Sequence, residues 1–502
     1  MVPKEQRDSP ECMAAKLEEL NKLAAFDTYT IVDDEGQERI TTTWVLTEKG
    51  TEKRARLTAR GFQEETTFPT DSPTVQKHSM KLMLAISATE KWIISTTDIT
   101  SAFLQGSEMD RHVYVKPPRE SNQKGKLWLL NKCLYGLKDA SRKWYLRVVE
   151  KLKNLGFQTS CYDSGLFFLI KDEKLIGIVA LHVDDFLHAG SKYFNDKIMP
   201  QLLGCFKVGK SETKEFMYTG FYMKQDTTGV RIDQNKYVRN VQIPTIDVQQ
   251  MKERDREMSQ DELTLLRQMT GIVNWAARAT RPDLSFDMID LSTKFKGGKV
   301  EDLIKAKNVA NRLKKDEVSI LISDLENLKD CEMIVYTDAA FRNLNDNTDS
   351  CGGYLVVIAN MKTGKIAPLE WKSGKLKRRV HSTLGAETQA LYNGLDAAVG
   401  LKLLLKEMYS GKVDLDVKAV TDNKSARDAI YSESEVTERI LRGDIAVIKQ
   451  MVQNGKVKEI RWVTGENMLA DILTKRGVNR ISLLETLESG KLTSHALNLI
   501  KE

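Results

Sequence analysis

Two adjacent carboxylates, Asp184 and Asp185, lie between two short apolar runs, residues 175–181 and 186–187. This pattern predicts a β-hairpin with both aspartates at its turn. Neighbouring carboxylates repel each other, and Mg²⁺, which prefers hard oxygen ligands, would relieve that repulsion. An Asp-Asp pair in an exposed turn is more often simple turn chemistry, so the pair alone leaves both interpretations open.

A third aspartate, Asp98, follows a β-branched run that predicts a strand. It is either a rigidly held carboxylate that faces a cleft or part of the cap of a short helix for which Thr100 or Ser101 is the N-cap. If both strands lie centrally in one sheet, Asp98 meets Asp184 and Asp185. Three such aspartates could hold two divalent metals about 3.5–4 Å apart, the arrangement that supports phosphoryl transfer.

Basic residues gather in two segments, residues 49–60 with five bases and one acid, and residues 372–379 with five bases and no acid. Such clusters are usually solvated faces. Beside carboxylate sites they also suit a polyanion that passes over metal centres. The first segment would then be placed to hold a triphosphate.

The pattern of predicted elements changes near residue 331. From there, predicted strands and helices alternate in one α/β domain up to about residue 478. Asp338 ends the first predicted strand and Asp422 ends a later one. Glu387 lies in a long helix that Ser382 or Thr383 caps, and Asp471 stands at a helix start. Any one of these acids alone is most simply a cap or a surface charge.

The composition bounds the class of protein. The 502 residues suggest roughly three domains, and 41% hydrophobic with 29% charged residues describe an ordinary globular chain with a mild net charge of +6. The six scattered cysteines fit a reduced, intracellular setting. We expect no membrane span, because no apolar run reaches about 20 residues, and no signal peptide at the charged N-terminus.

Two further helical segments are predicted from apolar spacing. Residues 10–25 carry a stripe of Met13, Leu17, Leu20 and Leu23, which suits a core helix or a docking helix. Residues 255–325 also read as helical, whereas the pattern leaves the tail after residue 478 either amphipathic or frayed.

Taken together, the sequence resembles the reverse transcriptase–ribonuclease H portion of the copia-type retrotransposon Pol polyprotein, over nearly its whole length. The motifs that carry the resemblance occur in order: RARLTARGF at 54–62, DITSAFLQG at 98–106, YVKPP at 114–118, LYGLK at 134–138, VDD at 183–185, TRPD at 280–283, DN at 422–423 and ADILTK at 470–475.

The resemblance implies an α+β and α/β multidomain fold, a right-hand polymerase with fingers, palm and thumb followed by a ribonuclease H-like α/β domain. The expected limits are an N-terminal helical leader (1–27), fingers and palm (28–240), a helical thumb or connection (241–330), the ribonuclease H-like domain (331–478) and a C-terminal tail (479–502).

The resemblance also implies roles for particular residues. Asp98, Asp184 and Asp185 correspond to the palm metal ligands. Phe103 falls at the steric gate against the sugar of the incoming nucleotide, although alone it reads as a core residue.

Further implied contacts surround the nucleotide. Tyr135 and Gly136 lie in the segment that lines its pocket, and Arg56 and Arg60 are candidates for binding its triphosphate. His182 stands where the family usually has tyrosine near the primer end.

In the second half, Asp338, Glu387, Asp422 and Asp471 correspond to the four carboxylates of ribonuclease H. Each of the two sites is expected to use two Mg²⁺ ions, with Mn²⁺ as an alternative. The implied partners are an RNA template, a DNA primer, an RNA–DNA hybrid and dNTPs, with other Gag and Pol products of the same element. The expected location is intracellular, in cytoplasmic virus-like particles, with access to the nucleus.

Some positions depart from the family pattern, beyond His182. Ala339-Ala340-Phe341-Arg342 replaces the usual Ala-Asp-Trp, and residues 439–450 contain no histidine. Three interpretations follow: an RNA-directed DNA polymerase with fused ribonuclease H, a non-catalytic nucleic-acid-binding remnant, and a chain that keeps only the ribonuclease H activity. Segments for Gag, protease and integrase are missing, so we expect the C-terminal part of a Pol or an orphan copy.

Overall fold

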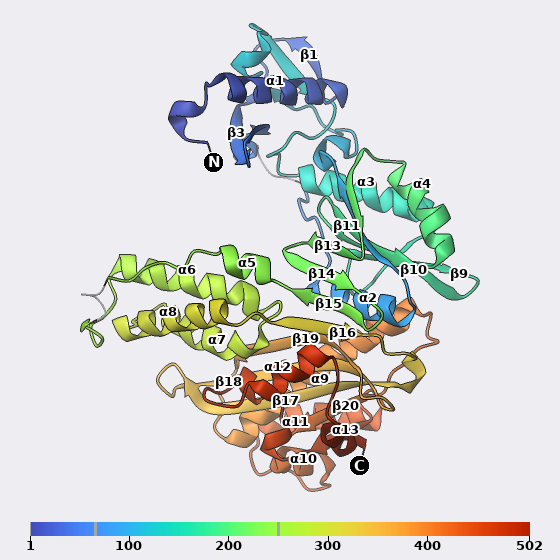
Figure 1. Ribbon diagram of the computed structural model, residues 1–502, viewed down its shortest axis with the longest axis vertical. Helices are drawn as coiled ribbons and strands as arrows, with labels where there is room; N and C mark the ends of the chain where they lie inside the picture. Colours follow the sequence, from blue (N-terminus) through green and yellow to red (C-terminus); the bar gives the residue numbers. More distant parts are fainter. Residues whose placement is uncertain (1, 65–67, 248–251, 502) are drawn as a thin grey trace.

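The computed structural model describes residues 2–64, 68–247 and 252–501. Within these residues the strands form five sheets, which run from the N-terminal sheets at the top of Figure 1 to a five-stranded sheet at the bottom. The expected right hand followed by a ribonuclease H-like domain is confirmed. The domain limits remain a prediction.

The fingers combine one helix with two small sheets. Ser9 begins the helix α1, since its hydroxyl accepts a 3.3 Å hydrogen bond from the backbone N–H of Cys12. Strands β1, β7, β6 and β2 form one sheet, and β3 and β4 form a separate hairpin. The bounds are α1 (Pro10–Ala25), β1 (Tyr29–Asp33), β2 (Arg39–Ile40), β3 (Thr42–Lys49), β4 (Glu52–Ala59), β6 (Tyr114–Val115) and β7 (Lys126–Leu130).

The predicted apolar stripe of α1 is half correct. Leu20 and Leu23 are buried in the fingers core, as expected. Met13 is 36% exposed and Leu17 is 46% exposed, because the helix turns Cys12 toward the β3–β4 hairpin instead.

The palm is a six-stranded sheet in the order β12-β5-β11-β10-β9-β8, with both faces covered. In β9, Leu166 and Phe168 pack with α2, whereas Phe167 and Leu169 pack with α3 on the other face. This two-residue alternation explains why the palm strands are apolar throughout. The elements are α2 (Lys77–Thr89), β5 (Ile94–Ile99), α3 (Ala140–Asn154), β8 (Gln158–Thr159), β9 (Leu166–Lys171), β10 (Lys174–His182), β11 (Asp185–Gly190), α4 (Met199–Leu203) and β12 (Val208–Thr213).

The region between palm and C-terminal domain is not all helical. A four-stranded sheet, β13-β14-β15-β16, includes Ser319–Ser323, so the helical prediction for residues 255–325 is wrong there. Strand β16 pairs with β15 because its Ile320 and Ile322 fill the core beneath. The elements are β13 (Glu215–Tyr218), β14 (Phe221–Gln225), β15 (Gly229–Asp233), α5 (Asn235–Asn240), α6 (Gln260–Ala277), α7 (Ser285–Thr293), α8 (Val300–Lys315) and β16.

The C-terminal domain has a five-stranded sheet in the order β19-β18-β17-β20-β21. Strand β17 is antiparallel to β18 and parallel to β20. Helix α9 crosses this sheet so closely that a Cβ on Gly394 would lie 2.6 Å from Cγ2 of Thr337. The elements are β17 (Cys331–Leu344), β18 (Asp349–Asn360), β19 (Ile366–Lys375), α9 (Thr383–Met408), β20 (Val417–Thr421), α10 (Lys424–Tyr431), α11 (Leu441–Gln453) and β21 (Glu459–Trp462).

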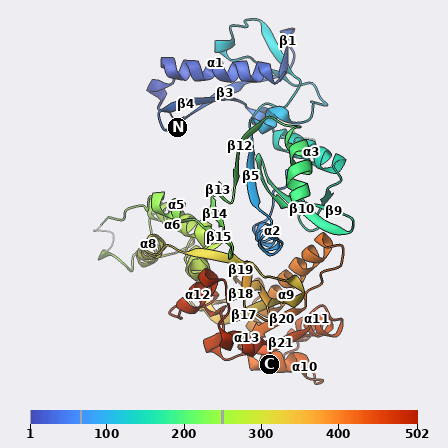
Figure 2. The ribbon, with the colours of Figure 1, turned by 45° about the vertical axis from the view of Figure 1, so that its right-hand side comes forward.

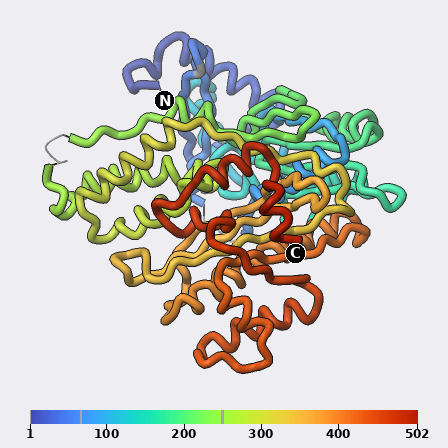
Figure 3. The backbone as a smooth tube through the Cα atoms, turned by 60° about the horizontal axis from the view of Figure 1, so that its bottom comes forward, coloured from blue at the N-terminus to red at the C-terminus, as the bar shows by residue number. Residues whose placement is uncertain are grey.

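The tail is ordered and packed, which decides between the two expectations for it. Helices α12 (Ile481–Ser489) and α13 (Ser494–Lys501) follow one another along the domain surface (Figure 3). Backbone hydrogen bonds hold the tail to the loop before β19: Ile366 N–H to Gly490 O, and Leu492 N–H to Gly364 O, both 2.8 Å.

One hydrophobic cluster contains residues of both halves. Helix α2 of the palm packs against both β16 and β19, and its apolar residues belong to the same cluster as those of β17, β18 and α9. Figure 2 shows α2 between the palm strands and the C-terminal domain. No helix in the described part of the chain has the length and apolar character needed to cross a membrane.

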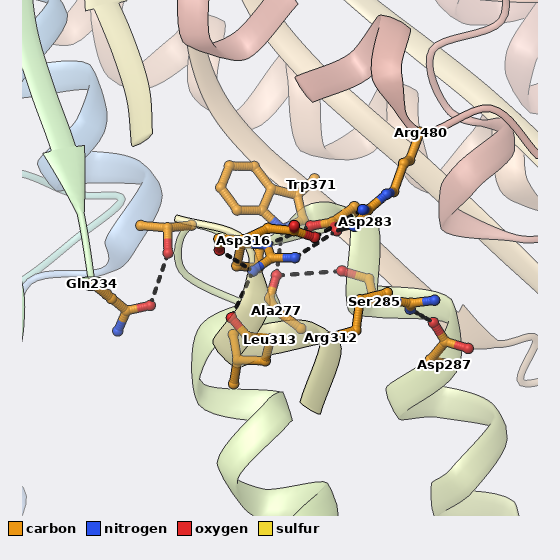
Figure 4. Close-up of polar contacts among 12 residues, drawn as sticks. Gln234, Ala277, Asp283, Ser285, Asp287, Arg312, Leu313, Asp316, Trp371 and Arg480 are labelled. Carbon is orange, nitrogen blue, oxygen red and sulfur yellow. Dashed lines mark hydrogen bonds and ion pairs between the residues drawn. The ribbon is translucent and has the colours of Figure 1, made fainter. Parts of the chain in front are cut away.

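A buried ion pair lies at the joint between the helices and the C-terminal domain (Figure 4). The guanidinium of Arg281, 2% exposed, donates two 2.9 Å hydrogen bonds to the carboxylate of Asp283, which is fully buried. Arg281 also donates to the backbone oxygens of Leu313 and Asp316 at 3.2 and 3.0 Å. Through Arg480, which donates to the Asp316 carboxylate at 2.8 Å, this network reaches the tail.

Asp283→Ala should lower the free energy of unfolding by about 3–5 kcal/mol, because it leaves the Arg281 cation buried without its partner. The midpoint of urea unfolding of the full chain measures the change. Glu317→Ala removes an exposed Arg–Glu pair with Arg239 and should move the midpoint little. Equal midpoints for the two variants would contradict a structural role for the buried pair.

Candidate active sites

The hairpin of the palm differs in one residue from the prediction. Strands β10 and β11 are antiparallel, and His182 pairs with Asp185, so the turn consists of Val183 and Asp184. Asp184 is therefore at the turn, as expected, but Asp185 is the first residue of β11. The hairpin closes with a two-residue loop in which Val183 has a positive φ of 57°.

The sheet brings the predicted aspartates together. Asp185 lies directly opposite Asp98 in the pairing of β11 with β5. The backbone N–H of Ile99 also donates a 2.9 Å hydrogen bond to the backbone oxygen of Asp184. Asp98 belongs to the strand, so it is not a helix cap. Ser101, one of the two residues expected at this position, occupies the N-cap of the short helix Ala102–Gln105, but its side chain forms no capping hydrogen bond.

Burial, together with the negative charges of Asp184 and Asp98, raises the pKa of Asp185 to about 6. Like charges opposite each other on neighbouring strands are destabilising. The site therefore concentrates negative charge that a divalent cation would offset.

Two residues that hold this site in place, Trp144 and Gly209, are not indicated by any sequence pattern. The indole N–H of Trp144 donates to the backbone oxygen of Val183 at 2.6 Å and so fixes the turn from helix α3. On the other side, β12 presents Gly209 to Asp98, where a Cβ would lie only 2.4 Å from the carboxylate Oδ2. Any larger residue there would displace the carboxylate.

Three of the expected nucleotide-binding residues are close together. The rings of Phe103 and Tyr135 lie 5.6 Å apart between centroids, and the guanidinium of Arg56 lies over the Tyr135 ring at 4.4 Å. Gly136 has a positive φ of 90°, and a Cβ there would lie 2.2 Å from the backbone oxygen of Ala59. Glycine is thus needed where this segment meets the fingers.

The two other candidates are less closely associated. Arg60 is exposed just after β4, and in the described part of the chain no hydrogen bond or ring contact joins it to Phe103 or Tyr135. His182 is half-buried at the end of β10, next to the aspartate turn.

A second carboxylate cluster forms in the C-terminal domain. Oxygens of Asp338, Asp422 and Asp471 all lie within 4.8 Å of one another, and across the described residues only this group brings three such ligand atoms so close. Asp338 comes from β17, Asp422 follows β20, and Asp471 begins a short 3-10 helix.

Glu387, the fourth expected carboxylate, lies in α9 and is buried, with its Oε2 atom lacking a hydrogen-bond partner. Burial raises its pKa, and the charges of Asp338 and Asp422 add to the rise. Burial likewise raises the pKa of Asp338. A buried, unpartnered carboxylate oxygen beside three further acids is the donor set that a divalent cation suits.

Lys475 was not among the predicted site residues, although it ends the ADILTK motif. Its ammonium lies 3.1 Å from Asp338 and 2.8 Å from Asp471. Burial alone would lower the pKa of Lys475, but these two carboxylates outweigh it and raise the pKa. The hydroxyl of Thr474 also donates to Asp338. The sequence does place Lys475 four residues after Asp471, a spacing typical of an ion pair on one helical face.

The cluster opens into a cavity of about 760 Å³ whose lining includes Glu387, Asp422, Asn423 and Lys475. The basic segment 372–379 lies along the end of β19 and the loop before α9. Part of its charge is paired, because Lys375 and Arg378 each form an ion pair with an aspartate.

Comparisons with known proteins find similar sequences. Residues 26–252 match the reverse transcriptase (RNA-dependent DNA polymerase) family. This segment is therefore similar in sequence to that family. The chain is similar to a retrovirus-related Pol polyprotein from transposon RE1 of Arabidopsis thaliana, with 25% identity over 457 residues that cover 86% of this chain and 30% of the relative. It is also similar to one from transposon TNT 1-94 of Nicotiana tabacum, with 26% identity, 93% of this chain and 36% of the relative.

Among solved structures, a foamy viral protease–reverse transcriptase in complex with double-stranded DNA matches with 12% identity and a TM-score of 0.28, covering 91% of this chain and 70% of that one. The chain thus resembles the reverse transcriptase portion of retrotransposon Pol polyproteins and spans about 30% of the length of the first relative. The resemblance read from the sequence motifs is confirmed.

Asp185 should make the stability of the chain depend on pH when divalent metal is absent. Its pKa is about 6 in the folded state against an ordinary value of 3.8, so the folded chain holds the proton more tightly. This contribution is fully present below about pH 4 and is lost as the pH rises through about 6. Urea midpoints across that range should therefore fall more for the wild type than for Asp185→Asn.

Asp172→Asn is the matched control, because Asp172 lies in the exposed turn between β9 and β10 of the same sheet. That variant should follow the wild-type curve. A wild-type curve that parallels the Asp185→Asn curve would refute the raised pKa.

Proposed function

We propose that this chain is an RNA-directed DNA polymerase with a fused ribonuclease H, which copies retrotransposon RNA into DNA and degrades the RNA of the hybrid. The observation that carries the proposal is the pairing of Asp98 with Asp185 beside the Asp184 turn, inside a domain of the reverse transcriptase family. The expected substrates are an RNA template, a DNA primer and dNTPs.

In the palm, Asp98, Asp184 and Asp185 would hold two Mg²⁺ or Mn²⁺ ions. When bound, such ions supply activation of the attacking oxygen and stabilisation of the leaving oxygen. The chain's own contribution is position, since antiparallel pairing and the Trp144 bond fix the carboxylates before substrate arrives. Glycine at position 209 leaves room for the Asp98 carboxylate, because a Cβ there would lie 2.4 Å from its Oδ2.

The nucleotide would lie against the ring pair of Phe103 and Tyr135. Phe103 would face the sugar and exclude a 2′-hydroxyl. Arg56, oriented by its stacking on Tyr135, and Arg60, exposed beyond the same strand, would bind the triphosphate. Gly136 lets the backbone of the pocket approach the fingers, and His182 would pack beside the primer terminus.

In the C-terminal domain, Asp338, Glu387, Asp422 and Asp471 would hold the metals of the ribonuclease H site. The support is the oxygen cluster within 4.8 Å together with the unpartnered Oε2 of Glu387. Lys475 would partly neutralise the carboxylates of Asp338 and Asp471. Its ammonium and a bound metal would compete for the same carboxylate oxygens. The assembly with other Gag and Pol products and the intracellular location remain predictions.

The two activities should be separable by isosteric changes. Asp185→Asn should abolish primer extension on an RNA template and leave cleavage of a preformed hybrid intact, because an amide has the shape of the carboxylate without its charge. Asp338→Asn should do the reverse. Both activities are measured on the purified full chain with Mg²⁺, and binding of primer–template serves as the control for folding.

Undiminished synthesis by Asp185→Asn would refute the palm assignment. Loss of both activities in either variant would refute two independent sites. A wild-type chain that binds primer–template but neither extends nor cleaves would support the non-catalytic remnant instead.

Phe103→Val should lower the selectivity for dNTPs over rNTPs by roughly tenfold or more, because truncation of the ring makes room for the 2′-hydroxyl. The measured quantity is the ratio of kcat/KM for dNTP to that for rNTP. Phe103→Tyr keeps the ring and should keep the ratio. If Phe103→Val leaves the ratio unchanged, Phe103 is a core residue and not a gate.

A further inference from the structure

A second cavity, of about 550 Å³, lies where α2 of the palm meets α6, α7 and strand β19 of the C-terminal domain. None of the seven carboxylates of the two candidate active sites lines it. Its charged lining is mostly basic, with Lys77, Lys81, Arg278 and Lys372 against the single acid Glu370.

The four basic side chains differ in how deeply they are buried. Lys81 is 2% exposed, Lys77 is half-buried, and Arg278 and Lys372 are exposed at the rim. Lys77 and Lys81 are one helical turn apart and therefore share a face of α2. Positive charge therefore extends from the exposed rim of the cavity to the buried Lys81.

Glu370 attracts Lys81 electrostatically but offsets only part of the charge of the four cations. Its Oε1 accepts a 2.9 Å hydrogen bond from the hydroxyl of Tyr354, and its Oε2 lies 3.4 Å from Nδ1 of His78. Both oxygens are thus engaged with groups other than the four cations.

Lys81 lacks the partner that a buried cation normally has. Within the described residues it forms no hydrogen bond or ion pair, and its ammonium lies 3.4 Å from the centroid of the Trp371 ring. Trp371 itself is fixed by donating to the backbone oxygen of Ala277 at 2.8 Å (Figure 4). A ring face attracts the charge but accepts few of its hydrogen bonds, so the ammonium can still donate toward the cavity.

The positive charges of Lys81 and Lys77 are unfavourable in this cavity, as the direction of their pKa shifts shows. Burial lowers the pKa of Lys81 well below its ordinary value, and the nearby Lys77 lowers it further. Burial and then Arg278 lower the pKa of Lys77. An anion in the cavity would offset all of these unfavourable effects at once.

We propose that this cavity binds a phosphate group. Several cations that converge on one small volume suit an anion with several oxygens, and the guanidinium fork of Arg278 matches two of them. The cavity volume of about 550 Å³ has room for one phosphate and its sugar, so a nucleic acid would enter with a single unit of its backbone. The source is either the backbone of bound nucleic acid, an assignment that rests on the proposed function, or a free phosphate ester.

The test compares Lys81→Met with the wild type and with Lys171→Met. Methionine keeps the length and the packing on Trp371 but removes the charge. Lys171 lies over the Tyr193 ring at 3.9 Å outside the cavity, so it is a matched lysine–ring pair. Arg278→Gln, at the exposed rim, tests the same cavity should Lys81→Met fail to fold.

In the first arm, the affinity for a short RNA–DNA hybrid is measured at several salt concentrations without divalent metal. If the backbone is the ligand, Lys81→Met should weaken binding several-fold and reduce the slope of log K against log salt by about 0.9, the value for one lost phosphate contact. In the second arm, inorganic pyrophosphate should raise the melting temperature of the wild type but not that of Lys81→Met.

A loss in the first arm assigns the cavity to nucleic acid, and a loss confined to the second assigns it to a free phosphate ester. Unchanged results in both arms, with Lys171→Met behaving as the wild type, would overturn the proposal. Because no metal is present, a chain that fails to extend primers can still pass this test, so failure of the proposed function is distinguishable from failure of this one.

Discussion

The buried ion pair of Arg281 and Asp283 is the contact on which the relation between the two halves depends. Its members lie two residues apart in the segment between α6 and α7, yet Arg281 also binds the end of α8 through two backbone oxygens. The loop after α8 leads directly to β16, and β16 joins the palm-side sheet to the core of the C-terminal domain. An arginine suits this place because its several donors satisfy a carboxylate and two carbonyl groups together. The TRPD motif therefore marks a structural joint.

Both carboxylate clusters must be held against their own repulsion, and the chain does this in two ways. In the palm, the antiparallel ladder fixes Asp98 opposite Asp185, where burial and then the charges of Asp184 and Asp98 raise the pKa of Asp185. In the C-terminal domain, Lys475 lies between Asp338 and Asp471 and compensates part of the charge. The second cluster is accordingly tighter and more deeply buried than the first.

Much of this could be predicted from sequence because the informative residues lie at the ends of regular elements. The apolar palm strands, the capped helix α9 and the aspartates in strands or just after them are predictable from local patterns. The supports were not, since Trp144 and Gly209 contact the palm aspartates only through tertiary packing. Strand β16 was read as helix because its pairing with β15 depends on residues about 90 positions earlier in the chain.

The shared core has a consequence for how the two sites work together. Helix α2 lies beneath the palm strands on one face and against β19 on another, so the palm and the C-terminal domain form one packed body. The distance between the two carboxylate clusters is then set by packing and not by a flexible linker. A nucleic acid that occupied both sites would have to match that fixed spacing, and any groove along its path would be lined by residues of both halves. The basic cavity at the junction of α2 and β19 has this composition, since its cations come from the palm helix, from α6 and from the C-terminal sheet.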